Sequence, residues 1–233
     1  MKAIVNEIFY SISGEGISTG IPTVFVRLAG CSLRCGLQQN KKLWCDTGYA
    51  LNPNAGSLMS IYDVIEKIDD YAAVPAQILL TGGEPLEGEK REFCKQLAKT
   101  IYTKQSNKQF VLVRVETNGK EAIDDLEHMV FSMDYKLPGS GMEKYMNPEN
   151  LQVIKSRKNP LDEIKFIVRD QSDFNRVLEV SKQYNLNTNL SISPVYNECK
   201  LDDLAEWILK ADFPGLRLSI QLHKLIWGEK RGV

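Results

Sequence analysis

The sequence has little histidine, almost no net charge and no long apolar run. Its 233 residues include two histidines, and 29 basic residues stand against 30 acidic ones, so the formal net charge is −1. A chain with this balance has no overall attraction for nucleic acid or for an anionic membrane surface. No apolar run approaches the roughly twenty residues that cross a bilayer. Composition therefore favours a protein that acts on something small, with neither nucleic acid nor a membrane as a partner.

Cysteine is also scarce, and its five residues are an odd number. The opening Met-Lys-Ala-Ile-Val-Asn-Glu lacks the basic, apolar and small-residue regions of a signal peptide. We therefore expect a cytoplasmic protein with reduced thiols rather than a secreted disulfide framework. Cys94 and Cys199 stand alone in the sequence, and we interpret both as structural or incidental.

The other three cysteines, Cys31, Cys35 and Cys45, fall within fifteen positions. Clustered thiols in a reducing compartment are more often metal ligands or catalytic groups than disulfides. Tetrahedral zinc normally takes four protein ligands, whereas a four-iron cluster held by three cysteines keeps one iron open for a ligand that takes part in chemistry. The triplet therefore predicts an iron–sulfur site. A non-catalytic zinc module, closed by His223 or Cys199, stays open as an alternative.

Apolar runs rich in branched residues alternate with longer charged stretches, which is typical of an α/β fold. Seven runs predict strands at 23–28, 78–81, 110–116, 130–135, 163–168, 190–193 and 217–222. Four amphipathic stretches predict helices at 60–71, 89–104, 172–184 and 200–210. Seven strands with helical crossovers indicate a partial or modified (β/α) barrel, similar to a TIM barrel.

No linker, internal repeat or low-complexity tract divides the sequence. We therefore interpret residues 1–233 as a single domain. The loosest stretch is 137–159, which combines glycine, proline and a Lys/Arg cluster, and we expect a solvated surface loop there.

A second chemical signature follows the predicted strand 78–81. The glycines of Gly82-Gly83-Glu84-Pro85 let backbone groups approach a ligand closely, and Thr81 and Glu84 add polar groups. Pro85 prevents the strand from continuing. Such a loop can also be a plain structural turn, so its functional interpretation depends on the cysteine triplet upstream.

Two charged residues lie in predicted strands. Arg27 interrupts an apolar run, and its rigid guanidinium can bind a carboxylate through two parallel hydrogen bonds. The alternative interpretation is that Arg27 is simply a charged residue on a half-exposed strand. Glu116 lies at the carboxyl end of a strand, where (β/α) barrels carry functional groups. The alternative interpretation is that Glu116 forms an ion pair with Arg114 or Lys120.

These motifs together resemble the radical S-adenosylmethionine (SAM) superfamily. The resemblance is carried by the cysteine triplet, the Gly-Gly-Glu-Pro loop and Val115-Glu116-Thr117-Asn118-Gly119. It implies a [4Fe-4S] cluster whose open iron is chelated by the amino and carboxylate groups of SAM. In that superfamily an electron from the cluster cleaves the sulfonium, and the 5′-deoxyadenosyl radical abstracts hydrogen from substrate inside a shielding barrel.

Residues outside the shared motifs are similar to the 7-carboxy-7-deazaguanine synthase family. They lie in the segments 6–9, 11–16, 22–31, 45–47 and 221–224. The resemblance implies a radical SAM lyase of queuosine and deazapurine biosynthesis, on a tRNA modification pathway. Its reaction converts 6-carboxy-5,6,7,8-tetrahydropterin to 7-carboxy-7-deazaguanine with loss of ammonia, using SAM catalytically and Mg²⁺.

The family resemblance also implies roles for particular residues. The cluster ligands are Cys31, Cys35 and Cys45, and Thr47 contacts Mg²⁺. The pterin is expected to contact Ile12, Ser13, Gly14, Arg27, Thr81 and the carboxylate of Val233. SAM is expected to contact Trp44, Cys45, Asp46, Gly83, Glu84, Glu116, Asn118, Asp134, Tyr135, Lys136, Ser193, Pro194, Val195 and Tyr196.

The sequence departs from the family pattern at three places. Residues 36–44 separate Cys35 from Cys45, so the cluster loop 31–45 is enlarged. Ser13 stands where the family usually has glutamine, and the sequence ends in Val233 instead of proline. A glycyl-radical-enzyme activating protein is the alternative enzyme, because it shares the cluster and the Gly-Gly-Glu-Pro loop, but its cysteines are more closely spaced.

The implied chemistry also calls for partners. Reduction of the cluster to a low potential requires an electron donor such as flavodoxin or ferredoxin. The family resemblance further implies a homodimer.

Overall fold

A computed structural model describes residues 1–37, 43–71, 76–104 and 111–233. In this part of the chain nine strands form one sheet, in the order β3-β1-β2-β4-β5-β6-β7-β8-β9. The strands are β1 Lys2–Ile12, β2 Pro22–Leu28, β3 Ser57–Ser60, β4 Gln77–Gly82, β5 Leu112–Thr117, β6 Val130–Asp134, β7 Glu163–Val168, β8 Asn189–Pro194 and β9 Leu216–Leu218.

The helices follow the strands in near alternation. They are α2 Ile61–Asp69, α3 Lys90–Lys104, α4 Glu149–Arg157, α5 Gln171–Gln183, α6 Leu201–Lys210 and α7 Leu222–Trp227. Short 3₁₀ turns add η1 Gly16–Ser18, η2 Gly48–Ala50, η4 Pro138–Ser140 and η5 Glu143–Tyr145. Among the described helices, none is long and apolar enough to span a membrane.

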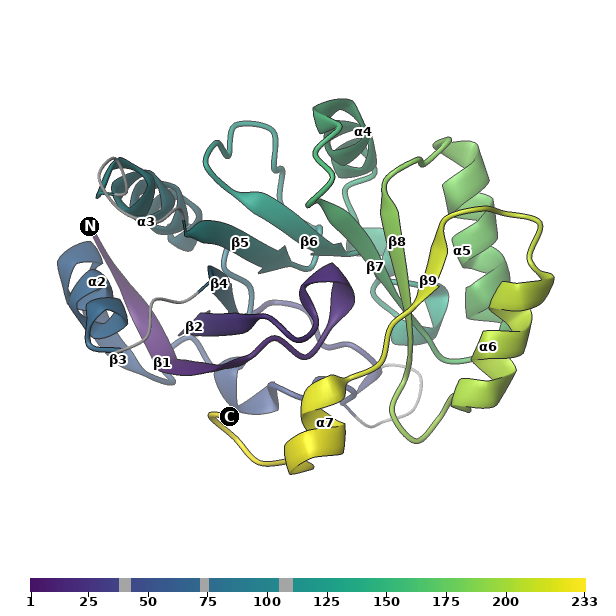
Figure 1. Ribbon diagram of the computed structural model, residues 1–233, viewed down its shortest axis with the longest axis horizontal. Coiled ribbons are helices and arrows are strands. Elements are labelled where there is room, and N and C mark those ends of the chain that lie inside the picture. The colour runs from purple at the N-terminus through teal and green to yellow at the C-terminus, as the bar shows by residue number, and fades with distance from the viewer. Residues whose placement is uncertain (38–42, 72–75, 105–110) are drawn as a thin grey trace.

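The sheet is parallel from β2 to β9, while β1 runs antiparallel to both of its neighbours. Figure 1 shows a strongly curved sheet with α3, α4, α5 and α6 along its outer face, and with α7 near β1. The end strands β3 and β9 do not pair with each other in the described part of the chain. The predicted α/β class is confirmed, with a mostly parallel sheet.

Alternation along the strands separates an apolar outer face from a polar inner face. On β7, Ile164 and Phe166 are fully buried in the apolar core, whereas the alternating residues Glu163 and Lys165 point inward. Successive side chains of a strand point to opposite faces, so one short segment supplies both layers. The inner face is therefore available for a polar site, and the core lies between the sheet and its outer helices.

Six of the seven predicted strands correspond to β2, β4, β5, β6, β7 and β8, and the four predicted helices correspond to α2, α3, α5 and α6. Residue 110 of the predicted strand 110–116 lies outside the described residues. The predicted strand 217–222 is wrong at its end, because the described strand stops at Leu218 and α7 begins at Leu222. The sequence interpretation also missed β1 and β3.

The prediction of a solvated loop over 137–159 is wrong. This segment contains η4, η5 and α4, and Leu151 is fully buried in the core. Buried polar groups hold it in place: Asp173 accepts from the Gly139 N–H (2.7 Å), and the Asn150 side chain of the segment donates to the Gly119 carbonyl (3.0 Å). Glycine and proline here shape a packed connection, because buried side chains satisfy backbone groups that water would otherwise bind.

Candidate active site

A cavity of about 790 Å³ opens on the polar inner face of the sheet. It is lined by loops after the parallel strands, by the turn between β1 and β2, and by the end of the chain. Of the residues that the sequence assigned to ligands, all except Cys31 and Tyr135 line this cavity. Tyr135 instead packs its ring against Phe166 in the core, with the ring centroids 5.8 Å apart.

The enlarged cysteine loop is closed at its base by a backbone hydrogen bond. The Trp44 N–H donates to the Cys35 carbonyl (3.0 Å), so the chain returns to Cys35 just before it reaches Cys45. The hydrogen bond brings the backbone before Cys45 next to Cys35, although nine residues separate these cysteines in the sequence. Residues 38–42 of this loop lie outside the described residues.

The three clustered thiols are free and half-buried. Burial raises the pKa of Cys31 to about 11 and also raises that of Cys35. Thiols with raised pKa values are protonated at neutral pH, and a bound metal would have to displace those protons. Cys94 is fully buried with its pKa raised further, and neither Cys94 nor Cys199 lines the cavity.

The Gly-Gly-Glu-Pro loop is joined to the cysteine loop through the backbone. The Gly83 N–H donates to the Leu28 carbonyl (2.8 Å), and the Glu84 N–H donates to the Gly30 carbonyl (2.9 Å). A Cβ atom at Gly83 would collide with the Gly30 carbonyl, so this close approach requires glycine. The motif thus fixes the position of the loop that precedes Cys31.

Glu84 connects this loop to the end of β5. Its buried carboxylate accepts hydrogen bonds from the Thr117 hydroxyl (2.7 Å), the Asn118 N–H (2.6 Å) and the Leu86 N–H (3.0 Å). Burial raises the pKa of Glu84 to about 6 despite these three donors. Asn118 in turn points its amide toward Cys31, with Nδ2 3.7 Å from Sγ.

Lys165 lies at the centre of an ion cluster that the sequence interpretation missed. Its ammonium group contacts carboxylate oxygens of Glu15 (2.5 Å) and Glu116 (2.7 Å), and the Thr81 hydroxyl donates to Glu116 (3.0 Å). Burial alone would raise the pKa of Glu15, but the Lys165 charge lowers it to about 2. The alternative pairing of Glu116 with Arg114 or Lys120 is not the one observed.

A second group of side chains converges beside this cluster. Ligand atoms of Glu15, Asp46 and His223 all lie within 4.8 Å of one another, and Gln221 donates to Glu15 (2.6 Å) and Asp46 (3.2 Å). Burial and the neighbouring Glu15 charge raise the pKa of Asp46. Carboxylate oxygens and an imidazole at these separations can hold a divalent cation. The Thr47 hydroxyl lies nearby in sequence, 3.3 Å from the Cys45 sulfur.

Arg27 reaches the cavity but is already paired. Its Nε donates to Glu7 (2.8 Å), which also accepts from the Tyr49 hydroxyl (2.8 Å) and from Arg231 (3.1 Å). The guanidinium of Arg231 lies over the Tyr49 ring at 3.7 Å from its centroid. Glu7 therefore binds one edge of the Arg27 guanidinium. Through Arg231 it also holds the end of the chain, where Val233 lines the cavity.

Three buried polar atoms around the cavity have no hydrogen-bond partner among the described residues: Trp44 Nε1, Asp134 Oδ1 and Ser193 Oγ. The other carboxylate oxygen of Asp134 contacts the Lys136 ammonium at 2.5 Å. Buried polar groups are nearly always paired, so unpaired polar atoms in residues that line a cavity call for an explanation. All three atoms belong to residues that the sequence assigned to SAM.

Comparison with known proteins identifies the class of this site. A model of the 4Fe-4S single cluster domain matches residues 12–160, which include the cysteine loop and the Gly-Gly-Glu-Pro loop. The site is thus of the radical SAM type, with a single [4Fe-4S] cluster. This match decides against the zinc module.

The chain belongs to the 7-carboxy-7-deazaguanine synthase family. It is 57% identical to the 7-carboxy-7-deazaguanine synthase of Leptospira interrogans, over 100% of this chain and 99% of that protein. It is 32% identical to the synthase of Clostridium acetobutylicum, over 100% of both chains. Its fold is similar to the crystal structure of QueE from Escherichia coli, with a TM-score of 0.71, 21% identity and coverage of 96% and 95% of the two chains.

Removal of the Lys165 charge is expected to destabilise the fold in a pH-dependent way. In Lys165→Met, the partly buried Glu15 and Glu116 carboxylates lose their cation, which costs about 3 kcal/mol of unfolding free energy at pH 8. The loss becomes smaller toward pH 5, because both carboxyls then have raised pKa values and bind protons in the folded state. Urea unfolding of variant and wild type at both pH values measures this loss.

The matched control is Lys182→Met, which removes a lysine from the exposed surface of α5. It should change stability by no more than about 0.5 kcal/mol.

In the wild type the lowered pKa of Glu15 stabilises the fold at pH values above 4.5, the ordinary pKa of the group, and this contribution is lost as the pH falls toward about 2. A Lys165→Met deficit that grows toward pH 5 would contradict the ion cluster.

Proposed function

We propose that this chain converts 6-carboxy-5,6,7,8-tetrahydropterin to 7-carboxy-7-deazaguanine and ammonia, the step of its family in queuosine biosynthesis. The observation that carries the proposal is that one cavity joins the cysteine loop, the Gly-Gly-Glu-Pro loop and the Lys165 ion cluster. Substrate and product differ only by ammonia, so the reaction needs no net oxidant or reductant. It is an elimination with rearrangement, which agrees with a lyase.

Cys31, Cys35 and Cys45 would hold the [4Fe-4S] cluster. When it is bound, the cluster with SAM supplies the radical that starts the reaction. The chain's own contribution is to hold the cysteine loop by the Gly83 and Glu84 backbone and to place the Asn118 amide beside Cys31. Both loops follow the carboxyl ends of parallel strands, where barrel enzymes carry their chemistry.

SAM would occupy the part of the cavity with unpaired buried polar atoms. Trp44 Nε1 can donate a hydrogen bond to SAM, Asp134 Oδ1 can accept one, and Ser193 Oγ can do either. The other cavity-lining residues of the SAM assignment are Cys45, Asp46, Gly83, Glu84, Glu116, Asn118, Lys136, Pro194, Val195 and Tyr196. Tyr135 would contribute indirectly, because its ring packs in the core next to the carboxyl end of β6.

The pterin would lie between the ion cluster and Arg27. Ionised Glu15 and Glu116 are hydrogen-bond acceptors suited to the N–H groups of a pterin ring. The edge of Arg27 that does not face Glu7 is suited to the substrate carboxylate. Ile12, Ser13, Gly14, Thr81 and Val233 complete the contacts that we assign to the substrate.

Turnover of anaerobically reconstituted protein tests this function directly. With SAM, Mg²⁺, a strong reductant and the carboxytetrahydropterin, mass spectrometry should detect 7-carboxy-7-deazaguanine. Cys45→Ala should lose both the iron and the product, whereas Cys199→Ala, which alters a thiol outside the cavity, should keep both. Formation of 5′-deoxyadenosine without the deazaguanine in the wild type would contradict the substrate assignment.

Mg²⁺ would bind at Thr47, which follows directly in the sequence after Asp46 of the Glu15, Asp46 and His223 group. Thr47→Val removes the hydroxyl but keeps the shape, so it should lose the stimulation of turnover by Mg²⁺ while keeping its iron content. Thr47→Ser keeps the hydroxyl and is the matched control. Turnover measured across a Mg²⁺ series decides the assignment, and an undiminished response of Thr47→Val would reject it.

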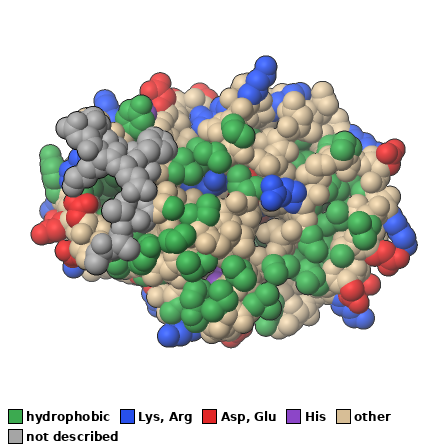
Figure 2. Space-filling view, viewed as in Figure 1, with side chains coloured by type: hydrophobic (Ala, Val, Ile, Leu, Met, Phe, Trp, Pro, Cys, Tyr) green, Lys and Arg blue, Asp and Glu red, His purple; other side chains and the backbone are tan. Residues whose placement is uncertain are grey.

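The remaining assignments concern partners and organisation. Figure 2 shows hydrophobic side chains gathered in the region where Figure 1 places α7, and Leu225 and Ile226 of that helix are 72% and 51% exposed. This surface supports a homodimer, and a monomer in sedimentation equilibrium would reject it. We also propose a flavodoxin or ferredoxin donor, a cytoplasmic location, and one domain over 1–233 with an enlarged cluster loop at 31–45.

A further inference from the structure

The turn between β1 and β2, residues 13–21, joins the two ends of the sheet. The Ile17 N–H donates to Glu163 on β7 (3.0 Å), and the Gly16 N–H donates to the Ser219 hydroxyl (3.1 Å) beyond β9. The Gly14 carbonyl accepts from the Leu222 N–H (2.8 Å) at the start of α7. Strand pairing leaves this sheet open in the described part of the chain, and the turn bridges the opening.

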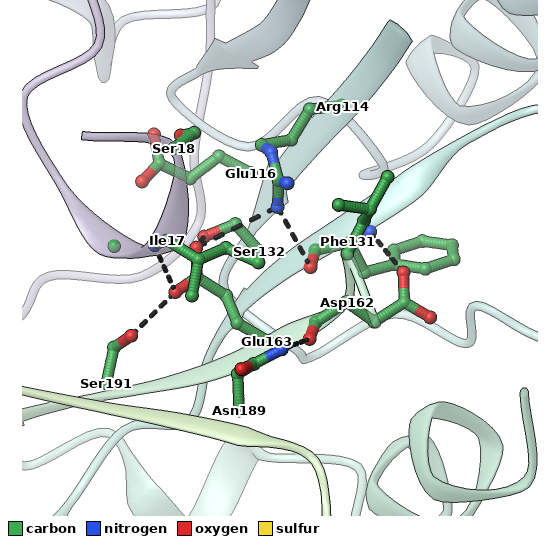
Figure 3. Close-up of polar contacts among 12 residues, drawn as sticks. Ile17, Ser18, Arg114, Glu116, Phe131, Ser132, Asp162, Glu163, Asn189 and Ser191 are labelled. Atoms are coloured by element: carbon green, nitrogen blue, oxygen red, sulfur yellow. Dashed lines mark hydrogen bonds and ion pairs between the residues drawn. The ribbon is translucent and has the colours of Figure 1, made fainter. Parts of the chain in front are cut away.

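Glu163 is the central acceptor beneath the turn (Figure 3). It is 1% exposed, and besides Ile17 it accepts hydrogen bonds from the hydroxyls of Ser132 (2.8 Å) and Ser191 (2.7 Å). The guanidinium of Arg114 lies 3.8 Å from the same carboxylate. Glu163 does not line the cavity, so it is separate from the residues assigned to ligands.

A polar belt runs from Glu163 around the inner face. Arg114 on β5 donates to Gln77 on β4 (3.4 Å), and Gln77 donates to Thr23 on β2 (2.9 Å). With the Ile17 hydrogen bond and the Arg114–Glu163 ion pair, these contacts connect the turn to β7, β5, β4 and β2, and β2 continues from the turn along the chain. Satisfied buried polar networks of this kind fix a single arrangement of their backbone.

The turn carries part of the cavity wall on its other side. Ser13, Gly14 and Glu15 line the cavity, and Glu15 reaches Lys165. Gly16 follows directly with φ of +63°, and a Cβ atom there would collide with the Glu163 carboxylate. The turn therefore lies directly against Glu163, and this close approach requires glycine at position 16.

We infer that Glu163 is a positioning residue for the substrate site: its carboxylate seats the turn 13–21 so that Ser13, Gly14 and Glu15 face the pterin. The identity of the ligand in this inference rests on the proposed function. The seating of the turn on Glu163 is independent of that function. Glu163 acts through the backbone N–H of Ile17 and does not touch the substrate.

Two variants test this inference. Glu163→Met removes both acceptor oxygens, so its side chain cannot accept from Ile17, but it also removes the carboxylate next to buried Arg114 and can impair folding. Gly16→Ala leaves Glu163 and Arg114 unchanged and displaces the turn by the collision described above. Its matched control is Gly20→Ala, in the same turn, with φ of +89° and open space around the added Cβ.

Hydrogen–deuterium exchange of the ligand-free protein reports on seating, and kinetics report on positioning. Glu163→Met and Gly16→Ala should exchange faster than the wild type in a peptide covering 13–21, and also faster than Gly20→Ala, which adds backbone strain without a collision. In the first two variants, the KM for the pterin should rise about tenfold and more 5′-deoxyadenosine should form per product, at unchanged iron content.

The outcomes separate the two claims. Wild-type exchange in Gly16→Ala, or equal loosening by Gly20→Ala, would overturn the seating of the turn on Glu163. Faster exchange with an unchanged KM and an unchanged ratio of 5′-deoxyadenosine to product would overturn the positioning role. If the wild type makes no deazaguanine, the proposed function fails, while the exchange difference still supports the seating.

Discussion

The Lys165 ammonium group, buried between Glu15 and Glu116, is the interaction on which the cavity depends. It joins the turn that follows β1 to the carboxyl end of β5 through a residue of β7, so three distant parts of the chain meet at one charge. Without this cation the two carboxylates would repel each other in a poorly hydrated interior. With it, they remain ionised acceptors in the place where a pterin would bind.

Much of the fold could be predicted from hydrophobic periodicity, because the outer face of each parallel strand packs on helices. The strand β1 could not, since it is mostly half-buried and has no continuous apolar run. The segment 137–159 was misread for a different reason. Its composition is that of a loop, but the Asp173 carboxylate and the Gly119 carbonyl, which both lie outside the segment, accept hydrogen bonds from its backbone.

The site followed from motifs where the chemistry is local, as in the cysteine loop and the Gly-Gly-Glu-Pro loop. Lys165 and Glu163 were missed, although a signal was present: both are charged residues inside the strand-forming run 163–168. A charge in such a run must find a buried partner, and its partners here lie about the turn 13–21. The identity of those partners depends on the closure of the sheet, which no local pattern reveals.

The ionisation state of Glu15 is the most direct test of this account. Carbon-13 carboxyl NMR of glutamate-labelled protein, with Glu15→Gln used to assign the signal, follows its titration as the pH is lowered from 7 to 4. The account predicts that Glu15 stays ionised over this range, because Lys165 lowers its pKa to about 2. A titration midpoint at or above the ordinary value of 4.5 would contradict it.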